Sequence, residues 1–443
     1  MADLPGELLL LVPTTSYRLE DFRVAARRLG VPLVVGSDRC HKIEDYFGEE
    51  KDLLSLDYRR PDHAAEQIAD AARHRPIRGI VPASDPTAVI AALAAERLGL
   101  PHNPPESARR AANKLAMRVA LTGAGLPVPR FRAFPVAEGP ARAAAEVDYP
   151  CVLKPLIFSA SRGVIRADDP GSFAAAWRRI ERLLRDTAPE RRAREEEGAK
   201  TLLVESFVPG PEVAVEGLLR GGALEVLAVF DKPDPLDGPY FEETIYVTPS
   251  RHPSALIARI EEVTAAGARA LGLVEGPIHA ELRLVPGSQS PREAGQERGL
   301  APEGPVVLEI AARSIGGLCS RTLRFGAGVS LEEVLVAHAM GLPLAPLRRE
   351  ARASGVMMLP IPRRGVLHGV RGLEAARAVP GVDDVVVTVP EGREVVPLPE
   401  GDSYLGFLFA HGETPADVEA ALRAAHARLS FEIREPLQVT SGA

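Results

Sequence analysis

The sequence predicts a multidomain protein that combines α/β and α+β parts, on three observations. The first hundred residues alternate short apolar runs with helical patterns, and the middle of the chain carries period-two runs typical of antiparallel strands. In addition, 443 residues are too many for a single hydrophobic core. We therefore expect an N-terminal parallel α/β domain, a central unit built mainly on an antiparallel sheet, and a small C-terminal α/β domain.

The N-terminal domain is predicted to span residues 1–110. Two apolar runs and a third, IRGIVPASD, which ends at Asp85, alternate with helical patterns at 19–29 and 63–74. This alternation is typical of a parallel sheet, whose ligand-binding loops lie at the carboxyl ends of the strands. Asp85 is expected in such a loop. No GxGxxG motif follows the first strand, so the dinucleotide-binding fingerprint is absent.

The central domain is predicted at 111–345 and the C-terminal domain at 346–443. The boundary between the first two domains falls in a helical pattern at 104–126, which has Asn113 and Lys114 in its middle. The C-terminal domain has several short strand patterns followed by a terminal helix, and we interpret it as a third, small α/β unit.

Composition and charge limit the class of partner. A formal net charge of −7 gives no electrostatic reason to expect binding to nucleic acid or to an anionic membrane. Cys40, Cys151 and Cys319 are too few and too far apart for a disulfide framework or a zinc site. No window approaches the roughly 20 apolar residues that span a bilayer, and the start has no secretory signal. We therefore expect a cytoplasmic protein.

Lys154 is the first residue predicted to carry chemistry. It lies in VLKP at the end of an apolar strand, where a cation is costly unless an anion meets it. The run LIFSASRGV follows, and its Ser159, Ser161 and Gly163 form a small-residue turn whose amide groups can approach a phosphate closely. The structural alternatives are a lysine that reaches solvent and an ordinary turn.

Four glutamates stand in apolar surroundings. Glu205 and Glu212 flank the turn in VESFVPGPE, where the structural alternative is two solvated strand ends. Glu281 in HAELRL and Glu309 in LEIAAR lie inside strongly apolar strands. Carboxylates that point to one side of neighbouring strands would form an oxygen-ligand site for magnesium, whereas buried unpaired carboxylates are costly.

The ordered set NK, VLKP, small-residue loop, VESFVPGPE, HAE and LEIAAR, between Asn113 and Gly317, resembles the ATP-grasp superfamily. The later motifs GVLHGV, GVDDVVV and GFLFAHGETPADVEAAL resemble the C-terminal domain of bacterial L-amino acid ligases. The resemblance implies a pre-ATP-grasp domain, then an ATP-grasp domain with a small lobe at about 125–205 and a large lobe at about 206–345. It also implies an ADP-forming carboxylate–amine ligase.

The resemblance further implies how ATP and magnesium are bound. The implied nucleotide contacts are Lys114 and Lys154 for the α- and β-phosphates, a flap of Ser159, Ser161 and Gly163 for the β- and γ-phosphates, a hinge of Glu205, Ser206, Phe207 and Val208 for the adenine edge, and Glu212 for the ribose hydroxyls. Glu281 and Glu309 are the implied ligands of one or two magnesium ions, for which manganese is the alternative.

Arg313 and His279 are the implied catalytic residues. Arg313 would stabilise the transferred phosphoryl group with planar, bidentate donors, and its structural alternative is a salt bridge. His279 would contact the oxyanion or the substrate, and its alternative is a buried structural histidine. Many relatives have Asn where this chain has Ala311, and their flap loops contain more glycine. The number of metal ions and the flap contacts therefore stay open.

The resemblance implies that the polar loop at 231–250 lies beside the region where the carboxylate and the acyl acceptor meet. Its candidate residues are Lys232, Tyr240, Glu242 and Glu243, and the acidic pair suits an α-ammonium group. The predicted reaction activates an amino acid as an acyl phosphate and joins it to an amine or a second amino acid, and it releases ADP and phosphate.

Two alternatives stay open. One is an ATP-grasp enzyme of the purine-ligase or biotin-carboxylase type, and the other is a non-catalytic nucleotide-binding protein. The expected partners are small-molecule carboxylates and amines, with no nucleic acid or membrane. A homodimer is common in the family, but the sequence leaves the oligomeric state and the identity of the substrates undetermined.

Overall fold

The computed structural model describes residues 6–14, 16–38, 52–186, 198–286, 304–326, 328–344 and 346–435, so Cys40 lies outside the described residues. The chain forms two compact units, and each takes segments from separate parts of the sequence. Unit 1 comprises Met1–Val128, Val213–Val229 and His252–Ala351, and unit 2 comprises Pro129–Glu212, Phe230–Arg251 and Arg352–Ala443. The segment 111–345 thus contributes to both units.

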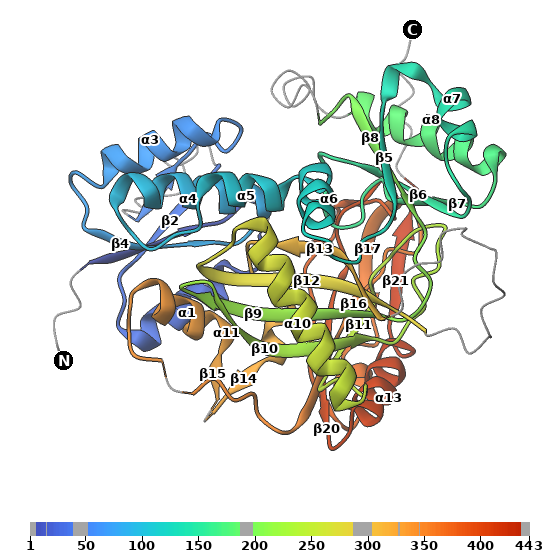
Figure 1. Ribbon diagram of the computed structural model, residues 1–443. Coiled ribbons are helices and arrows are strands. Elements are labelled where there is room, and N and C mark those ends of the chain that lie inside the picture. The colour runs from blue at the N-terminus through green and yellow to red at the C-terminus, as the bar shows by residue number, and fades with distance from the viewer. Residues whose placement is uncertain are drawn as a thin grey trace, which may run out of the picture. The chain divides into compact units, whose positions relative to one another are not determined.

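Unit 1 begins with a parallel four-stranded sheet in the order β3-β2-β1-β4, which confirms the predicted N-terminal α/β architecture (Figure 1). The apolar strand β1 is buried because helices pack against it, as is usual for parallel sheets. The bounds are β1 Glu7–Leu11, α1 Leu19–Leu29, β2 Leu33–Ser37, β3 Leu53–Ser55, α3 Pro61–Ala71, β4 Ile77–Pro82, α4 Asp85–Leu98, α5 Pro105–Ala112 and α6 Lys114–Gly123.

Helix α4 had no counterpart in the predicted pattern. Its residues from Thr87 to Ala95 are all buried, so the helix is apolar on every side and shows no amphipathic period. Ser84 and Thr87 form a capping box at its start, directly after β4. Asp85 is therefore the first residue of a helix as well as the end of the VPASD motif.

The predicted helix at 104–126 is in fact two helices. Asn113 has an extended backbone (φ −113°, ψ 111°), and its side chain accepts hydrogen bonds from the N–H groups of Leu115 and Ala116 at 3.0 and 3.1 Å. Asn side chains compete with the helical backbone for hydrogen bonds and favour N-caps. The prediction that Asn113 lies mid-helix was wrong, and Lys114 is the first residue of α6.

The remainder of unit 1 is an antiparallel sheet in which β13, β12, β9 and the first part of β10 are neighbours. Helix α10 crosses these strands in Figure 1, and its Ile260 and Val263 share a core with Ile278 and Ile310. The bounds are β9 Glu212–Arg220, β10 Ala223–Lys232, α10 Ser254–Leu271, β12 Gly276–Val285, β13 Gly304–Ala311, η2 Cys319–Thr322, β14 Arg324–Phe325, β15 Val329–Ser330 and α11 Leu331–Ala339.

Unit 2 contains a four-stranded antiparallel sheet in the order β5-β8-β6-β7, covered by α7 and α8. The apolar face of α8 buries Phe173, Trp177 and Ile180 against Leu153 and Leu202 of the sheet. The bounds are β5 Phe131–Pro135, η1 Val136–Glu138, α7 Pro140–Ala145, β6 Cys151–Pro155, β7 Ile165–Ala167, α8 Pro170–Asp186 and β8 Thr201–Ser206.

The rest of unit 2 is the C-terminal α/β part. Strands β11, β16, β20 and β18 are neighbours in one antiparallel sheet, β19, β17 and β21 form a second, and α13 contributes Val418 and Leu422 to their core. The predicted fold class is thus confirmed in both units. The bounds are β11 Ile245–Thr248, β16 Ala353–Leu359, β17 Gly365–Arg371, α12 Leu373–Arg377, β18 Val382–Val387, β19 Glu394–Val395, β20 Gly406–Gly412, α13 Pro415–His426 and β21 Ser430–Arg434.

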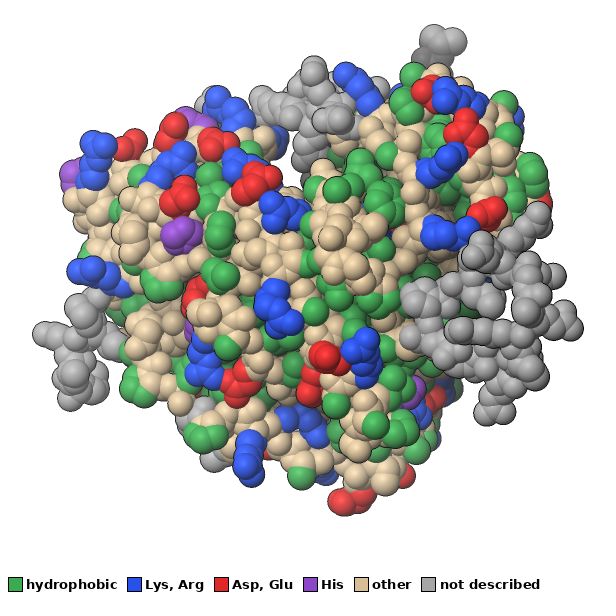
Figure 2. Space-filling model, in the orientation of Figure 1, with side chains coloured by type: hydrophobic (Ala, Val, Ile, Leu, Met, Phe, Trp, Pro, Cys, Tyr) green, Lys and Arg blue, Asp and Glu red, His purple; other side chains and the backbone are tan. Residues whose placement is uncertain are grey.

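The surface carries charges of both signs. On the face shown in Figure 2, acidic and basic side chains are interspersed with hydrophobic ones. Cys151 and Cys319 are free thiols, and both are buried. In the described ranges, none of the helices combines the length and the apolar character that crossing a bilayer requires.

Replacing Trp177 with Ala should destabilise unit 2. The indole is fully buried and lies edge-on to Phe134, with ring centroids 6.4 Å apart, so its removal leaves a large cavity. We expect a loss of about 3–5 kcal/mol in the free energy of unfolding, measured by urea denaturation followed by circular dichroism. Arg178→Ala, an exposed neighbour on the same helix, is the control. Equal midpoints for the two variants would contradict the role of Trp177 in the core.

Candidate functional site

One face of the antiparallel sheet in unit 1 gathers ionisable side chains from neighbouring strands. Glu281 on β12 lies directly opposite Glu309 on β13, and His279 lies opposite Ala311. Residues opposite each other in an antiparallel pair point to the same side, with Cβ atoms about 4.5–5.5 Å apart. The two glutamates predicted as metal ligands are therefore neighbours, and both are half-buried.

His279 is held between two carboxylates. Its Nδ1 lies 3.2 Å from Oε2 of Glu216 on β9, and its Nε2 lies 3.7 Å from Oε1 of Glu281. Burial lowers the pKa of His279, but the hydrogen bonds and charges of Glu216 and Glu281 outweigh it and raise the pKa to about 9. The side chain is buried, so both structural and functional roles are compatible with its position.

Glu216 was not among the predicted residues. It is fully buried, and burial raises the pKa of its carboxyl group, an effect that His279 partly offsets. The Glu216 carboxylate also accepts a hydrogen bond from the backbone N–H of Ile315 at 3.0 Å. A single glutamate inside the apolar run VAVEGLL was the available signal.

Arg313 follows the end of β13 and forms a bidentate ion pair with Asp85. Nε and Nη2 of Arg313 donate to the two Asp85 oxygens at 2.9 and 3.2 Å, and Nη1 donates to the carbonyl of Ser314 at 3.1 Å. Burial would lower the pKa of Arg313, but Asp85, Glu309 and Glu281 raise it. The arginine thus carries its charge within reach of the predicted metal carboxylates.

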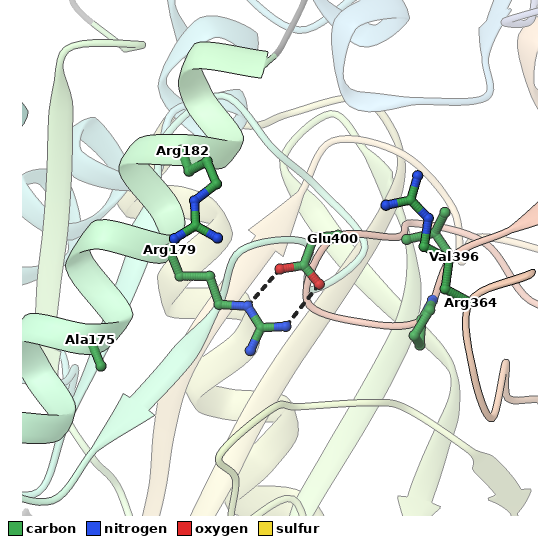
Figure 3. A pocket seen from close by; sticks show the side chains of 7 residues that line it. Ala175, Arg179, Arg182, Arg364, Val396 and Glu400 are labelled. Atoms are coloured by element: carbon green, nitrogen blue, oxygen red, sulfur yellow. Dashed lines mark hydrogen bonds and ion pairs between the residues drawn. The ribbon is translucent and has the colours of Figure 1, made fainter. Parts of the chain in front are cut away.

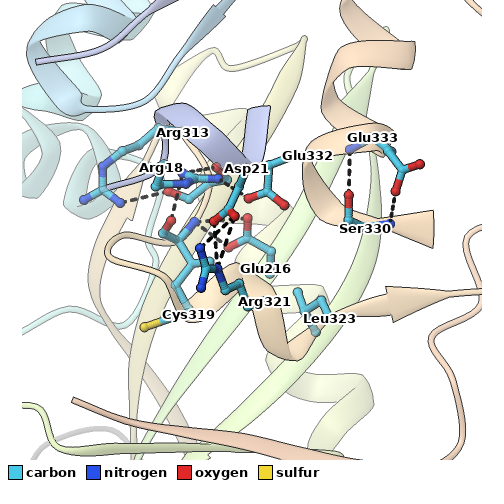
Figure 4. A network of polar contacts seen from close by, with 12 residues as sticks. Arg18, Asp21, Glu216, Arg313, Cys319, Arg321, Leu323, Ser330, Glu332 and Glu333 are labelled. Carbon is cyan, nitrogen blue, oxygen red and sulfur yellow. Dashed lines mark hydrogen bonds and ion pairs between the residues drawn. The ribbon is translucent and has the colours of Figure 1, made fainter. Parts of the chain in front are cut away.

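The loop after β13 is fixed by a buried network that includes Arg18 (Figure 4). Nη1 of Arg18 donates to Ser314 Oγ at 2.8 Å and to the carbonyl of Ile315 at 3.0 Å, and Nη2 lies 3.1 Å from Glu332 Oε1. Arg18 and Glu332 are each only 2% exposed. Neither was predicted, because neither lies in a recognisable motif, yet together they position the segment that carries Arg313.

Lys114 is half-buried at the first turn of α6. Backbone N–H groups at a helix N-terminus favour anions, which agrees with a phosphate contact for this lysine. Its predicted role stays a prediction.

In unit 2, Lys154 on β6 pairs with Glu205 on β8. Nζ lies 2.6 Å from Glu205 Oε2, and the side chains are 15% and 1% exposed. The anion that a lysine at this strand end requires is therefore supplied within the protein.

The predicted hinge comprises the last two residues of β8, Glu205 and Ser206, and the two residues that follow the strand. The N–H groups of Ser206 and Phe207 donate to the carbonyls of Arg130 and Pro150 at 2.8 and 3.0 Å, and Val208 is buried. Glu205 and Ser206 also line a cavity of about 180 Å³. The hinge thus has a fixed backbone beside a small cavity.

The predicted flap has an unusual backbone. Ala160 and Ser161 have φ of 54° and 55°, in the left-handed region that costs non-glycine residues roughly 1–2 kcal/mol each. The N–H of Gly163 donates to the carbonyl of Pro399 at 2.8 Å. Ser159 is exposed and Ser161 is half-buried. Successive N–H groups of a turn can form a concavity that binds anions.

Lys232 gathers two of the other predicted residues. Its Nζ lies 2.6 Å from Glu212 Oε1, is also paired with Glu243, and lies 5.0 Å from the ring centroid of Tyr246. Glu212 was predicted to accept from ribose and Glu243 to read the substrate, and both carboxylates are here partners of one buried ammonium group.

Glu242 and Tyr240 differ in their surroundings. Glu242 is half-buried, and burial raises the pKa of its carboxyl group. No cation pairs with Glu242 among the residues that the structure describes. Tyr240, in contrast, accepts a hydrogen bond from Arg179, whose guanidinium carbon lies 5.1 Å from the centroid of the tyrosine ring.

Three domain families match the chain. The ATP-grasp N-terminal domain matches residues 22–102, the ATP-grasp domain matches 147–294, and the L-amino acid ligase C-terminal domain 2 matches 357–434. The chain is built from ATP-grasp domains and a C-terminal domain of the L-amino acid ligase type. The resemblance found in the motifs is thereby confirmed.

Curated proteins with similar sequences include a synthase and a ligase. The chain is 26% identical to the uncharacterized protein y4rH of Sinorhizobium fredii, over 98% of this chain and 84% of that protein. It is 30% identical to carnosine synthase 1 of Gallus gallus (79% of this chain, 38% of that protein) and 24% identical to alanine–anticapsin ligase of Bacillus subtilis (67% and 62%). The chain spans less than two thirds of these two named enzymes.

Solved structures share the fold. The L-amino acid ligase of Bacillus licheniformis superposes with a TM-score of 0.75 at 24% identity, over 97% of this chain and 99% of that chain. The N5-carboxyaminoimidazole ribonucleotide synthetase of Thermotoga maritima superposes with a TM-score of 0.65 at 15% identity, over 97% and 100%. The chain therefore shares the fold of these structures over nearly its whole length.

Loss of the Glu332 carboxylate should lower the stability of unit 1. Glu332→Gln leaves the buried Arg18 guanidinium without its ion-pair partner, and breaking a buried pair costs about 3–5 kcal/mol. Glu20→Gln, which removes the exposed partner of Arg27, should cost at most about 1 kcal/mol. Thermal melts of both variants would compare the two costs, and equal Tm values would show that Arg18 does not depend on Glu332.

Proposed function

We propose that this ATP-grasp protein is a ligase that activates an amino acid carboxylate with ATP and joins it to an amine or a second amino acid. The activated species is an acyl phosphate, and the products are a peptide or amide, ADP and phosphate. The observation that carries this proposal is the pairing of Glu281 with Glu309 on adjacent strands, with the Arg313 guanidinium nearby in the same unit.

The carboxylate pair fits a magnesium ion. Like charges directly opposite each other in a sheet are unfavourable, and a divalent cation with oxygen ligands removes the repulsion. Glu281 and Glu309 would hold the ion, and the ion when bound would neutralise charge on the phosphates of ATP. The imidazole of His279 beside Glu281 would orient this carboxylate.

Arg313 would stabilise the transferred phosphoryl group. A guanidinium has five N–H donors, and three of those in Arg313 are used by Asp85 and Ser314. Two therefore remain for phosphate oxygens. The ion pair with Asp85 and the network around Arg18 would hold the arginine in place, which lowers the cost of reorganisation during the reaction.

In unit 2, the contacts to ATP would come from Lys154 and from the strained turn that follows β6. The Lys154 ammonium is 15% exposed beside Glu205, so it can meet a phosphate without leaving its partner. The N–H groups around Ser161 would cover the phosphates, and the backbone at Phe207 and Val208 would bind the adenine. Lys114, in unit 1, would add a further phosphate contact.

The ion pairs of Lys232 change which carboxylate we expect to bind the substrate ammonium group. Because Glu243 and Glu212 neutralise Lys232, we propose that Glu242 is the carboxylate that accepts the substrate ammonium group. Its half-buried carboxyl lacks a cationic partner in the described part of the chain, and an ammonium ion would supply one. The Tyr240 hydroxyl accepts a hydrogen bond from Arg179, and we assign it no substrate contact.

Arg313→Ala should abolish turnover while ATP still binds. Loss of donors to a developing anion costs about 10²–10³ in kcat per donor. Phosphate release would measure turnover, and calorimetry with MgATP would measure binding. The matched control is Arg321→Ala, which removes another arginine paired bidentately with an aspartate, Asp21, and should keep near-normal kcat. Full activity of Arg313→Ala would contradict the assignment.

Glu242→Gln should raise the KM for the amino acid about tenfold or more, because a charge-assisted hydrogen bond contributes about 1.5–3 kcal/mol. Burial raises the pKa of Glu242, so protonation should weaken amino acid binding at a higher pH than an ordinary glutamate would. Affinity should therefore fall as pH decreases in the wild type and stay flat in Glu242→Gln. If Glu242→Ala and Glu243→Ala both leave the affinity unchanged, the ammonium hypothesis fails.

A phosphate-release screen with single amino acids and pairs, followed by mass spectrometry of the products, tests the reaction itself. Stimulation by bicarbonate or by a ribosyl phosphate instead of amino acids would favour a carboxylase or purine-ligase activity, whose structures share the fold. Tight ATP binding without ADP formation across all acids and amines would favour a non-catalytic protein. The C-terminal domain of the L-amino acid ligase type supports stimulation of phosphate release by amino acids.

A further inference from the structure

A cavity with arginine-rich walls lies in unit 2, outside all the residues assigned above to ATP, metal or substrate. It has a volume of about 380 Å³, which suits a small ligand. Its lining residues are Ala175, Arg179, Arg182, Arg364, Val396, Pro397 and Glu400. In Figure 3, Arg179 and Arg182 project from α8, Arg364 lies on the opposite side, and Glu400 lies between them.

The cavity wall has an excess of positive charge. Three arginines and one glutamate give a net charge of +2. Nε and Nη2 of Arg179 contact the two Glu400 oxygens at 2.5 and 2.9 Å, and Nη1 donates to the Tyr240 hydroxyl. This guanidinium is therefore satisfied, and its pKa is raised by Glu400.

Of the two other guanidinium groups, Arg364 has an exposed acidic partner and Arg182 has none among the described residues. Arg364 contacts Glu394 at 2.8 Å, but the side chains are 69% and 47% exposed, so the pair adds little stability. Arg182 has no acidic partner among the described residues, and it lies one helical turn from the positive charge of Arg179. Two planar donor groups on opposite walls thus face one space.

We propose that this cavity is a binding site for a small anion with at least two negatively charged oxygen groups, such as a phosphate or a polycarboxylate. Guanidinium groups bind both classes with paired N–H donors. The anion would neutralise Arg182 and accept hydrogen bonds from Arg364, while Arg179 stays paired with Glu400. It would thereby connect α8 of the ATP-grasp domain with residues 364–400 of the C-terminal domain, both in unit 2.

The test uses the full-length protein with saturating MgADP present throughout, so that a nucleotide site is occupied. Calorimetry with inorganic phosphate and, separately, with citrate measures affinity at low ionic strength, where charge effects are largest. The double variant Arg182→Gln and Arg364→Gln should bind about tenfold more weakly or worse, since hydrogen bonds between charged groups are stronger than those between neutral groups. Arg178→Gln, a same-helix control that does not line the cavity, should bind like the wild type.

Chemical modification gives an independent readout. Phenylglyoxal labelling followed by mass spectrometry should show that the bound anion protects Arg182 and Arg364 but not Arg178. Tighter binding of phosphate than of citrate would identify a phosphate site, and the reverse order a polycarboxylate site. The proposal is wrong if neither probe binds the wild type at millimolar concentration, or if the double variant and Arg178→Gln bind equally well.

Discussion

The constraint on which the rest of the structure depends is the convergence of carboxylates on one face of the antiparallel sheet in unit 1. Glu216, Glu281 and Glu309 come from three neighbouring strands, and two of them are directly opposed. Half-buried like charges that lie directly opposite each other in a sheet are unfavourable without cations. His279 lies between two of these carboxylates, and Arg313, already paired with Asp85, lies within reach of Glu281 and Glu309. The negative charge that remains is a reason to expect a metal ion there.

The surroundings of this face hold it rigid. Glu216 binds the backbone of Ile315, and Arg18 binds the same segment from the other side through Ser314 and Ile315. The buried pair between Arg18 and Glu332 connects α11 to this segment. Arg313 is consequently presented on a loop that buried ion pairs fix, and preorganised donors of this kind act on developing charge without reorganisation.

In unit 2 as in unit 1, buried charges are held by ion pairs within the protein. Lys154 is neutralised by Glu205, and Lys232 by Glu212 and Glu243, so each lysine in the apolar sheets has its anion in place. In the described part of the chain, Glu242 and Arg182, which lines the 380 Å³ cavity, lack such partners. Charges without protein partners are the places where ligands bind most readily, and they separate the proposed substrate and anion sites from the structural ion pairs.

The sequence by itself determined the fold class and the apolar strands that carry the two glutamates predicted as metal ligands, because apolar strand patterns and ordered motifs are local properties. It did not reveal α4, which lacks an amphipathic period, or the break at Asn113, which depends on a cap. Only the tertiary structure decided which charges are paired. Arg18 and Glu332 form a buried ion pair, Glu216 accepts a hydrogen bond from Ile315, and Glu243 pairs with Lys232. These contacts join residues that are distant in the chain, and no local sequence pattern encodes them.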